Sequence, residues 1–211
     1  VNTCEITNRK EYMDAERDLI MYLQKYKDAD DDKIAKAMRG EVMVRINILR
    51  QISARGKVRD VIEFVKDFRE NGKKIILFCS LHEVVDQLKR YFPTAVSVTG
   101  RDSQDEKQRA VDAFQNNPKA DIIICSIKAA GVGLTLTASS NVAFVEFPWT
   151  YADCCQCEDR AHRIGQKDSV TCYYFLGRRT IDEKVYRIIQ EKKNIANAVT
   201  GSTEDIAVSY T

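Results

Sequence analysis

The sequence predicts an α/β fold in which helices cover both faces of a mostly parallel sheet, preceded by a helical extension. Short apolar runs alternate with amphipathic helical patterns at least five times after Gly56, which is the order that a parallel sheet with crossover helices requires. Most of the runs are continuously apolar, as is typical of strands buried on both faces. The length of 211 residues fits one such domain with an appendage.

Two helices are expected ahead of the sheet, over residues 8–27 and 33–53, with an acidic turn between them. We interpret the basic residues of the second helix as a solvated face, with a nucleic-acid-facing or linking helix as the alternative. A third helix, over 57–70, is expected to end at Asn71-Gly72. The predicted units are a helical extension (1–55), an α/β domain (56–198) and a tail (199–211).

Five strands are expected within the α/β domain, and most of the helices between them begin with a recognisable cap. The strands are predicted at 73–79, 95–98, 121–125, 142–147 and 170–176. Sequences of the form Ser/Thr-x-x-Glu begin at Ser80, Ser103 and Thr180, and each predicts the start of a helix. A further helix is expected from about Ala152, and the last helix is expected to end near Ala198.

Composition limits the classes of function. The net charge is +2, so charge alone does not indicate nucleic-acid binding. The seven cysteines are odd in number and have no framework spacing, which indicates reduced thiols and an intracellular location. The sequence contains neither an apolar run long enough to span a bilayer nor a secretion signal, so no membrane partner is expected.

The loops that follow the strands carry most of the motif-like residues. In a parallel sheet, ligands bind beyond the carboxyl ends of the strands. The loop at 126–133 is rich in small residues, and Gly131 and Gly133 allow its backbone N–H groups to approach an anion. A tight turn needs the same residues, so the loop alone leaves both interpretations open.

A polar stripe follows on the helix after Pro148. Gln156, Arg160 and Arg163 are spaced at i, i+4 and i+7, and so lie on one face. Two guanidinium groups and an amide on one face suit a polyphosphate, although a surface pair between Asp159 and Arg163 is an equal alternative. Trp149, the single tryptophan, either stacks on a base or packs at the rim of the sheet.

Other chemistry is not indicated. Glu146 ends an apolar strand as a metal-binding acid of a nucleoside triphosphatase does, but the G-x-x-x-x-G-K-[ST] loop that this role needs does not occur, and Gly56-Lys57 does not fit it. The spacing of Cys154, Cys155, Cys157 and His162 does not fit a zinc site, so no metal ligands are assigned. His82 is expected on the surface.

Several of these segments together resemble one family. Residues 156–166 (Q-C-E-D-R-A-H-R-I-G-Q) closely resemble motif VI of the SWI/SNF-related ATPases of helicase superfamily 2, and residues 126–137 resemble motif V. Residues 75–80 match motif IV, residues 98–115 match the segment that follows it, and residues 177–185 match the closing segment. The resemblance extends from about Gly56 to Lys193 in consistent order.

The resemblance implies a RecA-like second lobe of a DNA-dependent ATPase. In such motors the amino-terminal RecA-like lobe binds most of the ATP and Mg²⁺, and the second lobe closes over the nucleotide. By position, Arg160 and Arg163 are implied as arginine fingers, and Gln156, Gly131 and Gly133 as nucleotide-facing residues. The implied DNA contacts are Ser80, Thr99, Gly100, Ser126, Lys128 and Trp149.

Two positions depart from the family pattern. Glu146 stands where the family usually has aspartate, and Thr150-Tyr151 stands in place of Asn-Pro. The first residue is Val1, and with no phosphate loop present we expect the chain to be the carboxy-terminal half of a larger motor that acts on duplex or branched DNA.

We expect such a half to be inactive as an ATPase on its own. A stand-alone nucleic-acid-binding module without ATPase activity is the alternative. A free-standing small-molecule enzyme would need a catalytic pair within the chain, and the sequence offers none.

Overall fold

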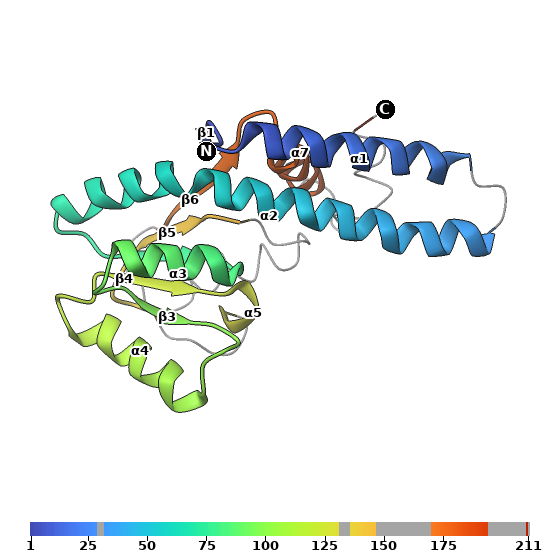
Figure 1. The fold of residues 1–211 in the computed structure, drawn as a ribbon. Helices are drawn as coiled ribbons and strands as arrows, with labels where there is room; N and C mark the ends of the chain where they lie inside the picture. Colours follow the sequence, from blue (N-terminus) through green and yellow to red (C-terminus); the bar gives the residue numbers. More distant parts are fainter. Residues whose placement is uncertain (29–31, 131–135, 147–169, 194–209, 211) are drawn as a thin grey trace.

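A computed structural model of the chain describes residues 1–28, 32–130, 136–146, 170–193 and 210 (Figure 1). Its elements, in order, are β1 (Asn2–Cys4), α1 (Arg9–Lys27), α2 (Asp32–Glu70), β2 (Ile75–Phe78), α3 (His82–Tyr91), β3 (Val96–Val98), α4 (Gln104–Asn116), β4 (Ile122–Cys125), α5 (Ile127–Ala130), β5 (Asn141–Phe144), β6 (Thr171–Gly177) and α7 (Ile181–Lys193).

All pairings in the sheet are parallel, and the strand order is β1-β6-β5-β2-β4-β3. Alternate residues of each strand point to opposite faces, so the sheet separates two apolar clusters. One cluster contains residues of α4 and α7, and the other contains residues of α3. The predicted α/β architecture, a parallel sheet with helices on both faces, is confirmed.

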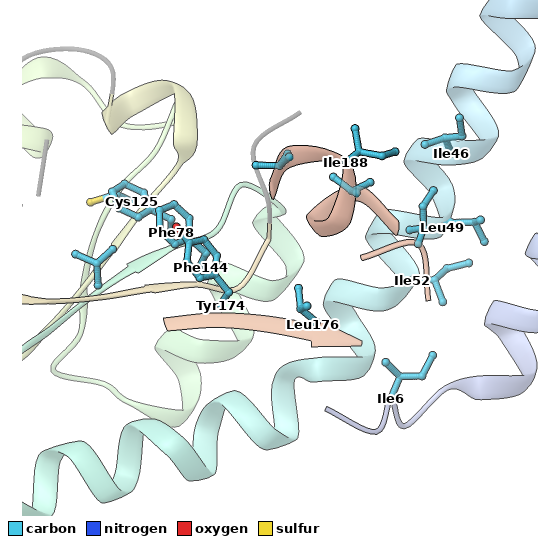
Figure 2. Packing of buried hydrophobic residues seen from close by; sticks show 14 of the residues in the cluster. Ile6, Ile46, Leu49, Ile52, Phe78, Cys125, Phe144, Tyr174, Leu176 and Ile188 are labelled. Carbon is cyan, nitrogen blue, oxygen red and sulfur yellow. The ribbon is translucent and has the colours of Figure 1, made fainter. Parts of the chain in front are cut away.

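Stacked rings join three neighbouring strands within the first cluster (Figure 2). Phe144 of β5 stacks on Phe78 of β2, with ring centroids 5.1 Å apart, and on Tyr174 of β6, with centroids 4.9 Å apart. Such aromatic contacts contribute on the order of 0.5–1.5 kcal/mol each beyond their buried area. They hold β2, β5 and β6 in register close to the ends from which the functional loops emerge.

The break that the sequence predicts between residues 53 and 57 is wrong. Helix α2 runs through this region and has 39 residues. Gly56 does not end the helix. Its missing side chain leaves room for the amino-terminal segment, since an added Cβ would lie 2.2 Å from Asn8 Oδ1 and 2.6 Å from Ile6 Cβ. The apolar pattern of the sequence changes between residues 53 and 57 because α2 packs into a different apolar cluster on each side of this region. Leu49 and Ile52 belong to the first cluster, and Val58 and Val61 belong to the second.

Helices α1 and α2 form a long antiparallel hairpin that extends past the sheet (Figure 1). The helix predicted over 8–27 is confirmed, and Tyr12, Leu19 and Leu23 are its buried residues. The Tyr12 hydroxyl accepts a hydrogen bond of 2.6 Å from the Ile181 N–H at the start of α7. The hairpin is therefore attached to the α/β unit at its base. The predicted division into three units stays a prediction.

The strand β1 was not predicted. It is three residues long, and it pairs with the outer edge of β6 through the register Asn2↔Phe175 and Cys4↔Gly177. A three-residue segment has no periodicity to detect, and its pairing with β6 bridges more than 170 positions of sequence.

The three capping sequences have different outcomes. At Ser103 both reciprocal bonds form, and the prediction is confirmed. The Thr180 hydroxyl accepts a bond from the Asp182 N–H, while Glu183 accepts from the Arg179 N–H rather than from Thr180. At Ser80 the prediction is wrong, because α3 begins one residue later than expected and its N-cap, Leu81, has no side-chain cap.

The helix expected from about Ala152 and the tail at 199–211, apart from Tyr210, lie outside the described residues. No helix in the described part of the chain has both the length and the apolar character needed to cross a membrane.

Candidate functional site

Four strands deliver their loops to one edge of the sheet. Hydrogen bonds continue past the strand ends: the Cys79 N–H donates to the Cys125 carbonyl (2.9 Å), the Ser126 N–H to the Val98 carbonyl (2.9 Å) and the Val145 N–H to the Phe78 carbonyl (3.0 Å). The loops after β2, β3, β4 and β5 therefore start side by side. Ser80, Thr99, Gly100, Ser126 and Lys128 all lie along this carboxyl edge, as the sequence predicts.

Ser80 joins two of these loops. Its side chain is exposed, and its Oγ accepts a hydrogen bond of 3.2 Å from the Ile127 N–H at the start of α5. A hydroxyl has one O–H donor besides its acceptor lone pairs. Within the described residues this O–H donates to no acceptor, so Ser80 can offer it to an anionic oxygen outside the protein.

The loop after β3 uses its threonine internally. Thr99 is 2% exposed, and both its N–H and its hydroxyl donate to Asp102 Oδ2, at 2.7 Å and 3.1 Å. The Arg101 N–H donates in turn to Thr99 Oγ1. Gly100 is exposed, with no atom within 4 Å of an added Cβ. In this loop Gly100 is open to a ligand, and Thr99 shapes the turn behind it.

The loop after β4 supplies the positive charge. Lys128 is exposed on α5, three residues after β4 ends. Ser126, two residues earlier in the chain, is 7% exposed. The loop of Lys128 adjoins the loops of Ser80 and Gly100. An exposed lysine there suits a phosphate of a nucleic-acid backbone, which positions a protein without reading base sequence.

Glu146 is directed inward, toward the backbone of the neighbouring loop. Its Oε2 accepts hydrogen bonds from the Ser80 N–H (2.5 Å), the Leu81 N–H (2.8 Å) and the Cys79 Sγ–H (3.3 Å). Burial and then the charge of Glu146 raise the pKa of the Cys79 thiol well above its ordinary value, so the thiol stays protonated. The sequence marked Glu146 only as an acid at a strand end and did not indicate these donors.

A buried ion pair lies behind the same edge, and sequence reasoning missed it. Lys57, considered above only as part of a poor match to a phosphate loop, is 1% exposed. Its Nζ lies 2.8 Å from Asp182 Oδ2 and donates to the carbonyls of Val145 (2.5 Å) and Phe175 (3.0 Å). Asp182 also accepts from the Ser53 hydroxyl and the Gly177 N–H.

The ion pair therefore ties α2 to the ends of β5 and β6 and to α7. The one sequence signal for this ion pair was a lysine that follows a glycine within an amphipathic helical pattern.

Outside the described residues lie those predicted to face the nucleotide (Arg160, Arg163, Gln156, Gly131 and Gly133), the predicted DNA contact Trp149, and the cysteines and histidine considered for zinc. Elsewhere in the chain, where side chains are described, no group of three or more potential metal ligands is found. His82 is exposed, as predicted.

Known proteins match this fold and this order of segments. Residues 56–165 match the family described as helicase conserved C-terminal domain. A SWI/SNF-related matrix-associated actin-dependent regulator of chromatin subfamily A-like protein 1 from Xenopus tropicalis is 33% identical over 145 residues. That match covers 66% of this chain but only 15% of the relative.

Solved structures agree in fold. The C-terminal part of the Fun30 ATPase domain matches with a TM-score of 0.74 at 17% identity, covering 100% of this chain and 96% of that one. The Sulfolobus solfataricus SWI2/SNF2 ATPase core, solved in complex with dsDNA, matches with a TM-score of 0.74 at 20% identity, covering 96% of this chain and 46% of that one. The chain belongs to the helicase conserved C-terminal domain family, and its fold and motifs are similar to those of the RecA-like carboxy-terminal lobe of SWI/SNF-related ATPases.

Proposed function

We propose that this chain is the second motor lobe of an ATP-dependent translocase or remodeller that tracks on double-stranded DNA. In this proposal the amino-terminal RecA-like lobe of the same parent chain holds most of the ATP and Mg²⁺. The present lobe contributes contacts to the DNA backbone from its carboxyl edge and arginines to the nucleotide. DNA as the partner implies an intracellular location.

The observation that carries the DNA part of the proposal is the arrangement of the carboxyl edge. The Ser80 hydroxyl, Gly100 and Lys128 come from three adjacent loops, and all three are exposed. They combine a hydrogen-bond donor, an open backbone and a cation, which are the groups that phosphates attract. Thr99 and Ser126 support these contacts from just beneath the surface. Trp149 is proposed as a minor-groove contact by its place in the motif.

The nucleotide part rests on the match to motifs V and VI. We assign Arg160 and Arg163 to the negative charge that develops on the transferring phosphoryl group, where one arginine contributes about 10³–10⁵ in rate. Gln156, Gly131 and Gly133 are assigned to the nucleotide face. ATP hydrolysis would supply the free energy for movement. Because the chain contains no phosphate loop, we propose that it hydrolyses no ATP alone.

A matched pair of lysine variants tests the DNA interface. Lys128 follows β4 at the carboxyl edge, and Lys119, which is also exposed, precedes β4 at the opposite edge. Removal of one phosphate contact weakens binding for all duplex sequences and lowers the slope of log Kd against log salt by about 1. We expect this result for Lys128→Ala and no change for Lys119→Ala, measured by fluorescence anisotropy of labelled duplex over a KCl series.

Equal effects of the two substitutions would contradict the proposal, since they would indicate diffuse attraction rather than a defined edge. A larger effect of Lys119→Ala would place the interface on the opposite side of the sheet.

A further inference from the structure

We propose that Glu146 is a positioning residue for the DNA-facing edge: through Ser80, its carboxylate fixes the loops after both β2 and β4 in one arrangement. The inference rests on the proposed function, because Ser80 and Lys128 are DNA contacts only within that function. It assigns Glu146 a role that differs from that of a metal-binding acid.

The first link is the set of donors around one carboxylate oxygen. Oε2 accepts two successive backbone N–H groups, those of Ser80 and Leu81, at 2.5 Å and 2.8 Å. These groups lie between the end of β2 and the start of α3, whose N-cap has no capping side chain. Hydrogen bonds to a charged acceptor are roughly twice as strong as neutral ones. Glu146 therefore holds, from another strand, a turn that has no local cap.

The second link is the Ser80 hydroxyl. With its N–H held by Glu146, Ser80 places Oγ 3.2 Å from the Ile127 N–H, across 47 positions of sequence. Ile127 begins α5, which carries Lys128. The relay from Glu146 to Ser80 to Ile127 thus crosses β5, β2 and β4, which are neighbours in the sheet.

The third link holds Glu146 itself. The preceding residue, Val145, donates its N–H to the Phe78 carbonyl at 3.0 Å and accepts at its own carbonyl from the buried Lys57. Both sides of the Val145 backbone are therefore fixed, and Val145 is itself 0% exposed. The anchor of the relay is rigid, whereas Ser80, at its far end, is exposed.

Amide hydrogen exchange tests the relay directly, and it does not depend on DNA. Glu146→Ala removes the acceptor, and we expect exchange at Ser80 and Leu81 to rise about tenfold, the effect of losing a backbone hydrogen bond. The relay predicts that Ile127, which Glu146 does not touch, responds as well. Ser80→Ala should affect Ile127, and Glu146→Gln, which keeps an acceptor oxygen but loses the charge, should accelerate the three amides less than Glu146→Ala does.

Glu183→Ala is the matched control, because Glu183 also accepts a backbone N–H, that of Arg179, at the start of α7. It should leave Ser80, Leu81 and Ile127 unchanged. If Glu146→Ala does not fold, Glu146→Asp shortens the side chain by one methylene and should accelerate the same amides to a smaller extent. The inference would be overturned if a folded Glu146 variant accelerated exchange at the Ser80 amide and left exchange at the Ile127 amide unchanged.

Duplex affinity then separates positioning from a general loss of stability. We expect Glu146→Ala to weaken binding, and we expect the double variant Glu146→Ala/Ser80→Ala to bind no more weakly than Ser80→Ala, because both act through one contact. Additive losses would mean that Glu146 acts outside the relay and would contradict the inference. If wild-type protein binds no duplex while Ile127 still responds to Glu146→Ala, the relay stands and the proposed DNA function fails.

Discussion

At the scale of single residues, the most consequential side chain is the buried Lys57. Its charge is removed from water, and burial of an isolated ammonium group is strongly unfavourable unless partners replace the lost hydration. Asp182 and the carbonyls of Val145 and Phe175 provide those partners. The same carbonyl of Val145 precedes Glu146, so the ion pair contributes to the geometry of the carboxyl edge.

Removal of one member of the pair should therefore be strongly destabilising. We expect Lys57→Met to lower the free energy of unfolding by roughly 3–5 kcal/mol, because Asp182 is left as an uncompensated buried charge. Lys66→Met, on the same helix but with a side chain that is 42% exposed, should cost far less. Urea unfolding followed by circular dichroism measures both. A loss below about 1 kcal/mol for Lys57→Met would show that the pair is not buried as described.

At the scale of secondary-structure elements, sequence reasoning succeeded where the pattern is local. The buried strands β2, β4 and β5 were predicted from continuous apolar runs, and α4 from its cap at Ser103. It failed where tertiary contacts decide. In the sequence Gly56 indicates a break in the helix, but its missing side chain makes room for Ile6 and Asn8, which lie 50 and 48 positions away. The pairing of β1 with β6 is likewise invisible in a three-residue segment.

Two glycines of the same helix test this interpretation of α2. In a helix interior, alanine is more stabilising than glycine by about 1 kcal/mol of folding free energy. At Gly40, where an added Cβ meets nothing within 4 Å, Gly40→Ala should stabilise the protein by up to that amount. At Gly56 the steric overlap with Asn8 and Ile6 should outweigh the gain, and Gly56→Ala should lower the unfolding midpoint. Thermal unfolding of both variants measures the two effects. An equal rise of the unfolding midpoint at both positions would contradict the close packing at Gly56.

At the scale of the whole molecule, the location of the candidate site could be predicted, but the hydrogen bonds and the ion pair within it could not. Ligands bind beyond the carboxyl ends of parallel strands, and this rule alone assigns Ser80, Gly100 and Lys128 to one edge of the sheet. The partners of Glu146 lie 65 to 67 positions away, and the Val145 carbonyl lies 88 positions from Lys57. A single sequence contains no distances, so such contacts emerge only from the fold.

DNA-stimulated ATP hydrolysis tests the central claim most directly. The protein to measure is one in which an amino-terminal RecA-like lobe precedes this chain, with Arg163→Ala as the variant. Arg59→Ala is the control, because Arg59 lies on α2 with a side chain that is 63% exposed. Duplex DNA should stimulate hydrolysis, Arg163→Ala should lower kcat by about 10³ or more, and Arg59→Ala should leave it unchanged. Full DNA-stimulated activity in Arg163→Ala would contradict the assignment of this chain as the lobe that supplies the catalytic arginine.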